Sequence, residues 1–135
     1  WDTKGHLAFL TDVISRFHEK GIRTSIFTGT DPEIIDYAAR TGTDRIELYT
    51  EPYASMYPSD REAAVAPFLK AAIVARDAGL GINAGHDLDL NNLAWLHKHI
   101  PWLMEVSIGH ALISDALYYG LENTIQMYLR ELRRS

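Results

Sequence analysis

The sequence contains no cysteine, and its hydrophobic runs are all too short to cross a membrane. The absence of thiols excludes disulfides, cysteine nucleophiles and thiolate metal sites, and it is typical of a reducing compartment. The opening segment, WDTKGHLAFL, has no basic region followed by a long apolar one, so no signal peptide is expected. These absences favour a soluble, cytoplasmic protein without membrane association.

Positive charge is also scarce, since the 135 residues carry a formal net charge of −5 at pH 7. General nucleic-acid binding depends on basic patches and is therefore not expected. A phosphate ligand stays compatible with this charge, because the start of a helix can hold one phosphate locally. The apolar share of 47% suffices for one hydrophobic core, so residues 1–135 are expected to form a single domain.

Signals for helices and strands alternate along the whole chain. The expected helices cover 6–20, 31–42, 59–79, 89–99 and the segment after 108, with a break at Gly120. A capping box at 59–62 opens the third of these helices. The expected strands cover 24–28, 45–50, 81–86 and 104–108. Strict alternation of this kind predicts a parallel sheet with right-handed crossovers.

Within the strands, apolar and polar residues alternate, which assigns them to opposite faces of the sheet. The residues expected to face the helices are Ile46, Leu48, Ile82, Ala84, Val106 and Ile108. Those expected on the opposite face are Glu47, Tyr49, Asn83, Gly85, Glu105 and Ser107. Helices packed on this second face would bury its carboxylates at high cost, whereas a barrel lumen that opens onto a wet site tolerates them. Because a closed barrel needs eight strands, the pattern predicts an α/β chain forming half of a (β/α)₈ TIM barrel.

Two of the expected strands end in the same dipeptide, Gly85-His86 in GINAGHDL and Gly109-His110 in VSIGHAL. In a barrel, the active site lies at the carboxyl ends of the strands. Glycine lets the backbone approach a ligand closely, and N–H groups at the start of the next helix bind phosphate oxygens. Histidine adds a proton donor near neutral pH. The two motifs therefore predict an active site that handles a phosphorylated ligand.

Three longer stretches contain these motifs: IELYTEPYA at 46–54, GLGINAGHDLDLNNL at 79–93 and EVSIGHALISDALYYGLENTIQMYL at 105–129. Together they resemble the pyridoxine 5′-phosphate synthase family of the deoxyxylulose-phosphate route to vitamin B6. The segment GIRTSIF at 21–27 is similar to that family's fifth strand, so the resemblance is to the C-terminal half. It implies that the chain contributes the last helix of the first half and four β-α units of a TIM barrel.

The resemblance also implies an activity for the complete barrel. The family condenses 3-amino-2-oxopropyl phosphate with 1-deoxy-D-xylulose 5-phosphate, and pyridoxine 5′-phosphate, phosphate and water are formed. By this resemblance His86 is the proton donor, Glu47 stabilises a transition state, and the backbone at Asp87 with Gly109 and His110 binds the aminoketone phosphate. No metal and no organic cofactor is implied. Small phosphorylated substrates, the N-terminal half of the barrel and further copies of the protein are the expected partners.

Three positions depart from the family pattern. Asp87 stands where some members have glycine, Tyr49 where many have histidine, and Glu51 where glycine is usual. A non-glycine residue at position 51 leaves the shape of the loop after the second strand open, because it resists a positive φ.

Plainer interpretations remain for several residues. His86 and His110 could be exposed or helix-capping side chains, Gly85 and Gly109 turn glycines, and Glu47 the partner of an arginine in the barrel core. Two imidazoles and the Asp87 carboxylate are also a plausible ligand set for a metal, although adjacent residues rarely aim at one ion.

For the whole chain, the alternative is a non-catalytic half-barrel that binds phosphate or pairs with itself. Another phosphate-handling barrel, such as an aldolase or isomerase, is less well supported because the strand ends carry no lysine. Three tyrosines of the final helices, Tyr118, Tyr119 and Tyr128, are expected to be packing residues.

Overall fold

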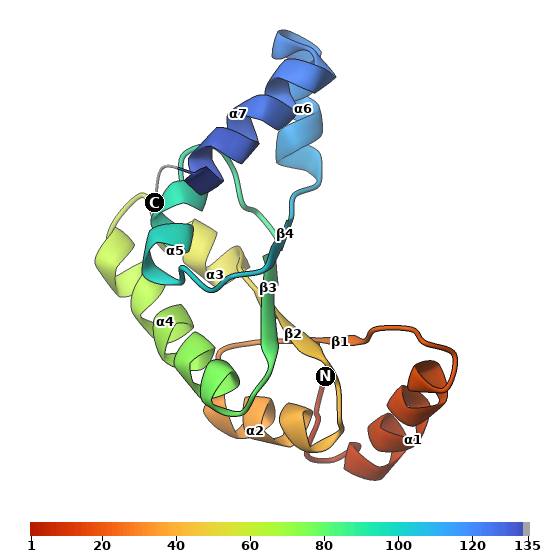
Figure 1. Cartoon of the computed structure of the whole chain (residues 1–135). Coiled ribbons are helices and arrows are strands. Elements are labelled where there is room, and N and C mark those ends of the chain that lie inside the picture. Colours follow the sequence, from red (N-terminus) through yellow and green to blue (C-terminus); the bar gives the residue numbers. More distant parts are fainter. Residues whose placement is uncertain (134–135) are drawn as a thin grey trace.

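A computed structural model describes residues 1–133 and shows helices and strands in the expected alternation (Figure 1). The strands are β1 (Ser25–Thr28), β2 (Arg45–Tyr49), β3 (Gly81–Gly85) and β4 (Glu105–Ser107). The helices are α1 (Leu7–His18), α2 (Pro32–Arg40), α3 (Glu51–Met56), α4 (Arg61–Asp77), α5 (Leu93–His99), α6 (His110–Tyr119) and α7 (Leu121–Arg133). None of the helices within 1–133 is both long and apolar enough to span a bilayer.

The four strands form one sheet in the order β1-β2-β3-β4, and every neighbouring pair is parallel. Because successive strands are neighbours and each is followed by a helix, the arrangement is that of consecutive β-α units in a barrel. The four parallel strands expected from the sequence are therefore confirmed.

Figure 1 shows α2, α4 and α5 along one side of the sheet. Within residues 1–133, α2 packs against β1 and α4 against β3, whereas Phe27 on the other face is exposed. The strand side chains that face the helices are fully buried at Ile46, Leu48, Ile82 and Ala84. The predicted assignment of faces is thus confirmed for β2 and β3, and we call the uncovered side the open face.

The segment after β2 differs from expectation. Residues 51–56 form the short helix α3 rather than a loop, and Glu51 begins it without a positive φ. The next helix also starts differently: Asp60, not Ser59, is the N-cap of α4 and accepts a hydrogen bond from Ala63 N–H at 3.0 Å. Two adjacent residues with capping ability cannot be ranked from sequence alone.

The helix expected over 89–99 begins later, at Leu93. The four residues before it form a turn closed by side chains, since Asp89 Oδ1 accepts from the N–H groups of Asn91 and Asn92 at 2.8 and 2.9 Å. Asp and Asn side chains commonly compete with helix formation in this way. The turn connects the end of β3 to α5 and so bounds the loop that follows Gly85.

The last two helices form a hairpin that projects beyond the sheet (Figure 1). The break at Gly120 is confirmed, with a φ of 78° that glycine adopts easily. Tyr128 is buried and donates a hydrogen bond to Asp115 at 2.8 Å. The expectation that Tyr118 and Tyr119 pack inside is wrong, because their side chains are 85% and 54% exposed on the hairpin.

Candidate active site

The carboxyl ends of β2, β3 and β4 surround a pocket of about 470 Å³ on the open face. The residues that line it are Phe27, Glu47, Gly85, His86, Asp87, Ser107, Ile108, Gly109 and His110. All five side chains and backbone positions predicted to form the site are among them. The structure therefore brings together residues that three different strand ends contribute.

Asp87 lies between the two histidines of the Gly-His motifs. Its Oδ2 is 3.4 Å from His86 Nδ1, and its Oδ1 is 3.4 Å from His110 Nε2. These distances are longer than those of ordinary charge-assisted hydrogen bonds, so the carboxylate does not fix the orientation of either ring. The His110 side chain is 80% exposed, which leaves it accessible to a ligand in the pocket.

The backbone at this point is strained. His86 and Asp87 have φ values of 96° and 57°, and they are the two non-glycine residues with positive φ within 1–133. Aspartate tolerates the left-handed region, but 96° lies outside it. Thr50 holds the segment, because its N–H donates to Gly85 O at 2.9 Å and its hydroxyl to His86 O at 2.5 Å. Strained backbone of this kind is common at functional sites, where it sets the direction of a side chain.

Glu47 occupies the centre of the open face. A Cβ added to Gly85 would collide with Glu47 Oε1 and would lie 3.0 Å from Ser107 Cβ. Glycine at position 85 therefore makes room for the carboxylate to lie over β3. Glu47 has no hydrogen-bond or ion-pair partner among residues 1–133, so its pairing with an arginine is not seen in this part of the barrel.

A different carboxylate on the open face is the one that pairs with arginines. Glu105 Oε1 lies 3.0 Å from Arg23 Nη1 and 2.8 Å from Arg45 Nη1, and Glu105 Oε2 accepts from Asn83 Nδ2 at 3.2 Å. The hydrogen bonds from Arg23 and Arg45 hold the pKa of Glu105 below its usual value. Within residues 1–133, the open face thus carries a paired carboxylate, Glu105, and an unpaired one, Glu47, in the same register row on either side of Asn83.

A comparison with protein families covers almost the whole chain. The family model described as "Pyridoxal phosphate biosynthesis protein PdxJ" matches residues 1–134. The chain belongs to the PdxJ family. The resemblance stated from the motifs is therefore confirmed.

Curated relatives carry the name pyridoxine 5′-phosphate synthase. The chain is 65% identical over 133 residues to the one from Phocaeicola vulgatus, 62% identical to that from Bacteroides thetaiotaomicron and 60% identical to that from Cytophaga hutchinsonii. Each alignment covers 98 or 99% of this chain but 56% of the relative. The chain therefore spans about half the length of the curated relatives it matches.

A solved structure shares the arrangement of this PdxJ-family chain. The crystal structure of the YdjI aldolase from Escherichia coli K12 superposes with a TM-score of 0.60 and covers 99% of this chain and 55% of that one. At 15% identity this likeness bears on the fold alone. Four parallel β-α units in a chain about half as long as its relatives make this half of a (β/α)₈ barrel.

Three residues that line the pocket were not predicted as site residues: Phe27, Ser107 and Ile108. Ser107 was already expected on the open face, and the alternation also places Phe27 there, because Ile26 and Thr28 on either side of it are buried towards the helices. Ile108 was expected to face the helices, and its place in the pocket lining differs from that expectation. A metal centre finds no support in the arrangement, since residues 1–133 hold no group of three His, Asp or Glu placed to bind an ion.

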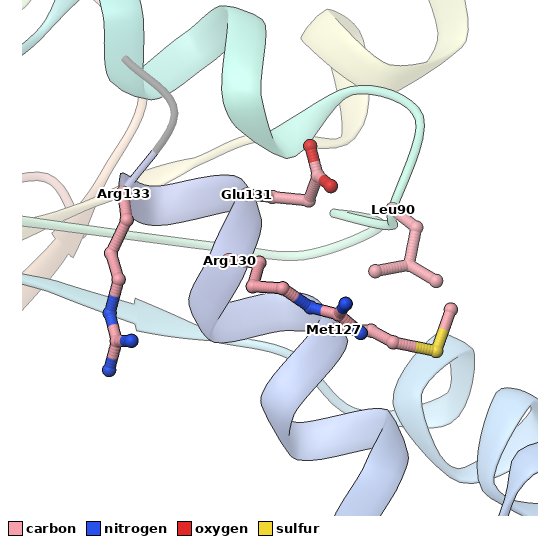
Figure 2. A pocket seen from close by; sticks show the side chains of 5 residues that line it. All are labelled: Leu90, Met127, Arg130, Glu131 and Arg133. Carbon is pink, nitrogen blue, oxygen red and sulfur yellow. The ribbon is translucent and has the colours of Figure 1, made fainter.

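Another pocket lies between α7 and the loop after β3, and Figure 2 shows its lining side chains. They are Leu90, Met127, Arg130, Glu131 and Arg133. None of these is a predicted site residue, and the pocket is distinct from the cluster at the strand ends. The predicted site residues all line the strand-end pocket instead.

Proposed function

We propose that the complete barrel to which this chain contributes is a pyridoxine 5′-phosphate synthase. It would condense 3-amino-2-oxopropyl phosphate with 1-deoxy-D-xylulose 5-phosphate to pyridoxine 5′-phosphate, phosphate and water. One observation carries the proposal: the residues assigned from separate motifs line a single pocket at the strand ends of a PdxJ-family chain. The relatives' name supports the reaction class.

In this proposal, the phosphate of the aminoketone binds where α6 begins. Gly109 is the N-cap of that ten-residue helix, and both Gly109 and His110 line the pocket. The first N–H groups of a helix have no intrahelical acceptor and carry the positive end of the dipole, which suits a phosphate. The backbone at Asp87 approaches the same ligand, while its carboxylate lies between the two imidazoles.

The ring-forming chemistry falls to His86 and Glu47. Pyridine formation requires loss of water and phosphate, and each departure is assisted when a positioned acid donates a proton. His86 lines the pocket with half of its side chain exposed, so a ligand can reach the imidazole. Glu47 contributes an unpaired carboxylate that stabilises a cationic, iminium-like stage.

The alternative function is a half-barrel that binds phosphate or pairs with itself without catalysis. Two observations support this alternative: the open face is uncovered within residues 1–133, and the chain spans about half the length of its relatives. The mass of the source protein separates the two: a mass near twice that of this chain supports the enzyme. A mass equal to this chain supports the alternative.

The proposal is tested in the complete barrel. By complete barrel we mean the full-length source protein or, where the source protein is this chain alone, its fusion to the unmatched part of the Phocaeicola vulgatus relative. The purified protein is incubated with both phosphorylated substrates, and pyridoxine 5′-phosphate and phosphate are measured. Formation of both products is expected. A folded complete barrel that forms neither would overturn the proposal.

A further inference from the structure

We propose that Tyr49 is a positioning residue that orients the His86 imidazole, with Phe27 supporting the Tyr49 ring from the other side. The inference rests on the proposed function, because His86 is the acid of that reaction. Neither Tyr49 nor Phe27 has a role in the reaction as proposed above.

The three rings follow one another across three strand ends. The Phe27 and Tyr49 centroids are 5.5 Å apart with planes at 61°, and the Tyr49 and His86 centroids are 4.8 Å apart at 69°. Both pairs are edge-to-face arrangements, the geometry in which the positive edge of one ring meets the electron-rich face of another. Tyr49 is therefore held on both sides, and its ring has a defined orientation.

The imidazole needs such a contact because little else fixes it. Apart from the ring contact with Tyr49, the polar partner of the imidazole within residues 1–133 is Asp87, whose oxygen is 3.4 Å from Nδ1 and too distant for strong orientation. The backbone of His86 is set by its positive φ and by the Thr50 hydroxyl, but these leave the side-chain torsions free. The Tyr49 ring restricts those torsions by occupying one side of the imidazole.

Two consecutive residues at the end of β2 thus hold the end of β3. Thr50 binds the main chain of Gly85 and His86, and Tyr49 contacts the ring of His86. The strand register agrees with these two contacts. Tyr49 is paired with Gly85, and Gly85 directly precedes His86, the residue with the strained φ. Phe27 completes the row from the sheet edge, where its 41% exposed side chain also lines the pocket.

The test uses three variants of the complete barrel. Tyr49→Leu removes the ring, Tyr49→Phe keeps the ring without the hydroxyl, and Tyr37→Leu makes the same change on α2, away from the pocket. Because displacing a catalytic group by about 1 Å can reduce the rate about 10²-fold, we expect kcat of Tyr49→Leu to fall about 10- to 100-fold. KM for the aminoketone phosphate should change less than threefold, roughly, since the phosphate contacts are intact.

Tyr49→Phe should restore kcat, and Tyr37→Leu should leave it unchanged. Nuclear magnetic resonance of the His86 ring protons adds a direct readout, because the adjacent aromatic ring shifts them. That shift should be lost in Tyr49→Leu and kept in Tyr49→Phe. If the wild type is active and its Tyr49→Leu variant keeps full kcat, the positioning role is refuted but the proposed function is not. If the wild type is folded and inactive, the proposed function is refuted. A Tyr49→Phe variant as slow as Tyr49→Leu would also overturn the inference.

Discussion

His86 combines a strained main chain with an accessible ring. The strain aims the side chain into the pocket, and the last residues of β2 hold it there. Half of the His86 side chain is exposed, so the imidazole can meet a ligand in the pocket, as the proposed role in proton transfer requires.

Replacing His86 tests this directly. In the complete barrel, His86→Asn should lower turnover by roughly 10²–10⁴, the usual contribution of general acid–base catalysis. Binding of the phosphorylated ligand should change little, because Gly109 and His110 supply the phosphate contacts in our proposal. Steady-state rates and calorimetric binding measure the two effects separately. His6→Asn, at the start of α1, is the matched control, and an unchanged rate in His86→Asn would remove the residue from the mechanism.

Glu47 should matter through its charge rather than its shape. Glu47→Gln keeps the volume but removes the negative charge, so turnover of the complete barrel should fall about 10²-fold or more. The melting temperature should change little, because within residues 1–133 no hydrogen bond or ion pair depends on this carboxylate. Kinetics and thermal unfolding are measured on the same preparation. Intact turnover with a melting temperature lowered by several degrees would make Glu47 a structural residue of the barrel core.

Most residues that line the strand-end pocket could be predicted from residue patterns, but the contacts between them could not. The Gly-His motifs identify His86 and His110 because strand ends meet at one edge of a parallel sheet. The position of Asp87 between them depends on two positive φ values, which sequence rules disfavour for residues other than glycine. The ring contact between Phe27 and Tyr49 depends on which side chains of neighbouring strands lie side by side, and this requires the strand register.

Among the secondary-structure elements, those with a strong periodic pattern were predicted best. The strand ranges agree within one residue at each end, and α1 and the break at Gly120 were also expected. The short helix α3 was missed because six residues containing a proline give no helical period. The exposure of Tyr118 was also missed. An apolar helix face indicates that the helix packs against something, but it does not identify the partner surface.

One carboxylate, Asp44, links the end of α1 to the segments before β1 and β2, beside the apolar packing of Leu10 and Ile14. It accepts from Thr24 N–H at 2.7 Å and lies 2.9 Å from His18 Nε2 at the end of α1. The pKa of Asp44 is lowered to about 2. The hydrogen bond from the Thr24 backbone contributes most to this, and the hydrogen bond with His18 contributes next. A carboxyl whose pKa is lowered on folding stabilises the fold above its ordinary pKa of 3.8, and the stabilisation is lost as the pH falls towards 2.

Asp44→Asn should therefore destabilise the complete barrel at neutral pH, by about 1 kcal/mol or less because the side chain is partly exposed to solvent. The difference from wild type should shrink as the pH is lowered from 4 towards 2. Urea unfolding at a series of pH values measures it. Asp12→Asn, on the exposed face of α1, is the control. A difference that stays constant through this range would show that the Asp44 charge is not the cause.

For the whole molecule, the important fact is that the open face is uncovered and that neither edge strand pairs with a further strand among residues 1–133. β1 pairs only with β2 and β4 only with β3 in this part of the chain, and Phe27 and Met104 are exposed large apolar side chains. Unpaired parallel edges and exposed apolar surface promote association. The same surfaces are the ones that a second set of β-α units would cover in a closed barrel.

This argument predicts how the isolated chain behaves. Residues 1–135, produced alone, should form a dimer or a larger assembly, because self-pairing is the available way to cover the edges and the open face. Light scattering coupled to size exclusion measures the mass. Adding the separately produced, unmatched part of the Phocaeicola vulgatus relative should convert the assembly into a species of one copy of each, since two complementary halves close the sheet. A stable, monodisperse monomer would mean that the edges are protected in another way, and the half-barrel account of the open face would then fail.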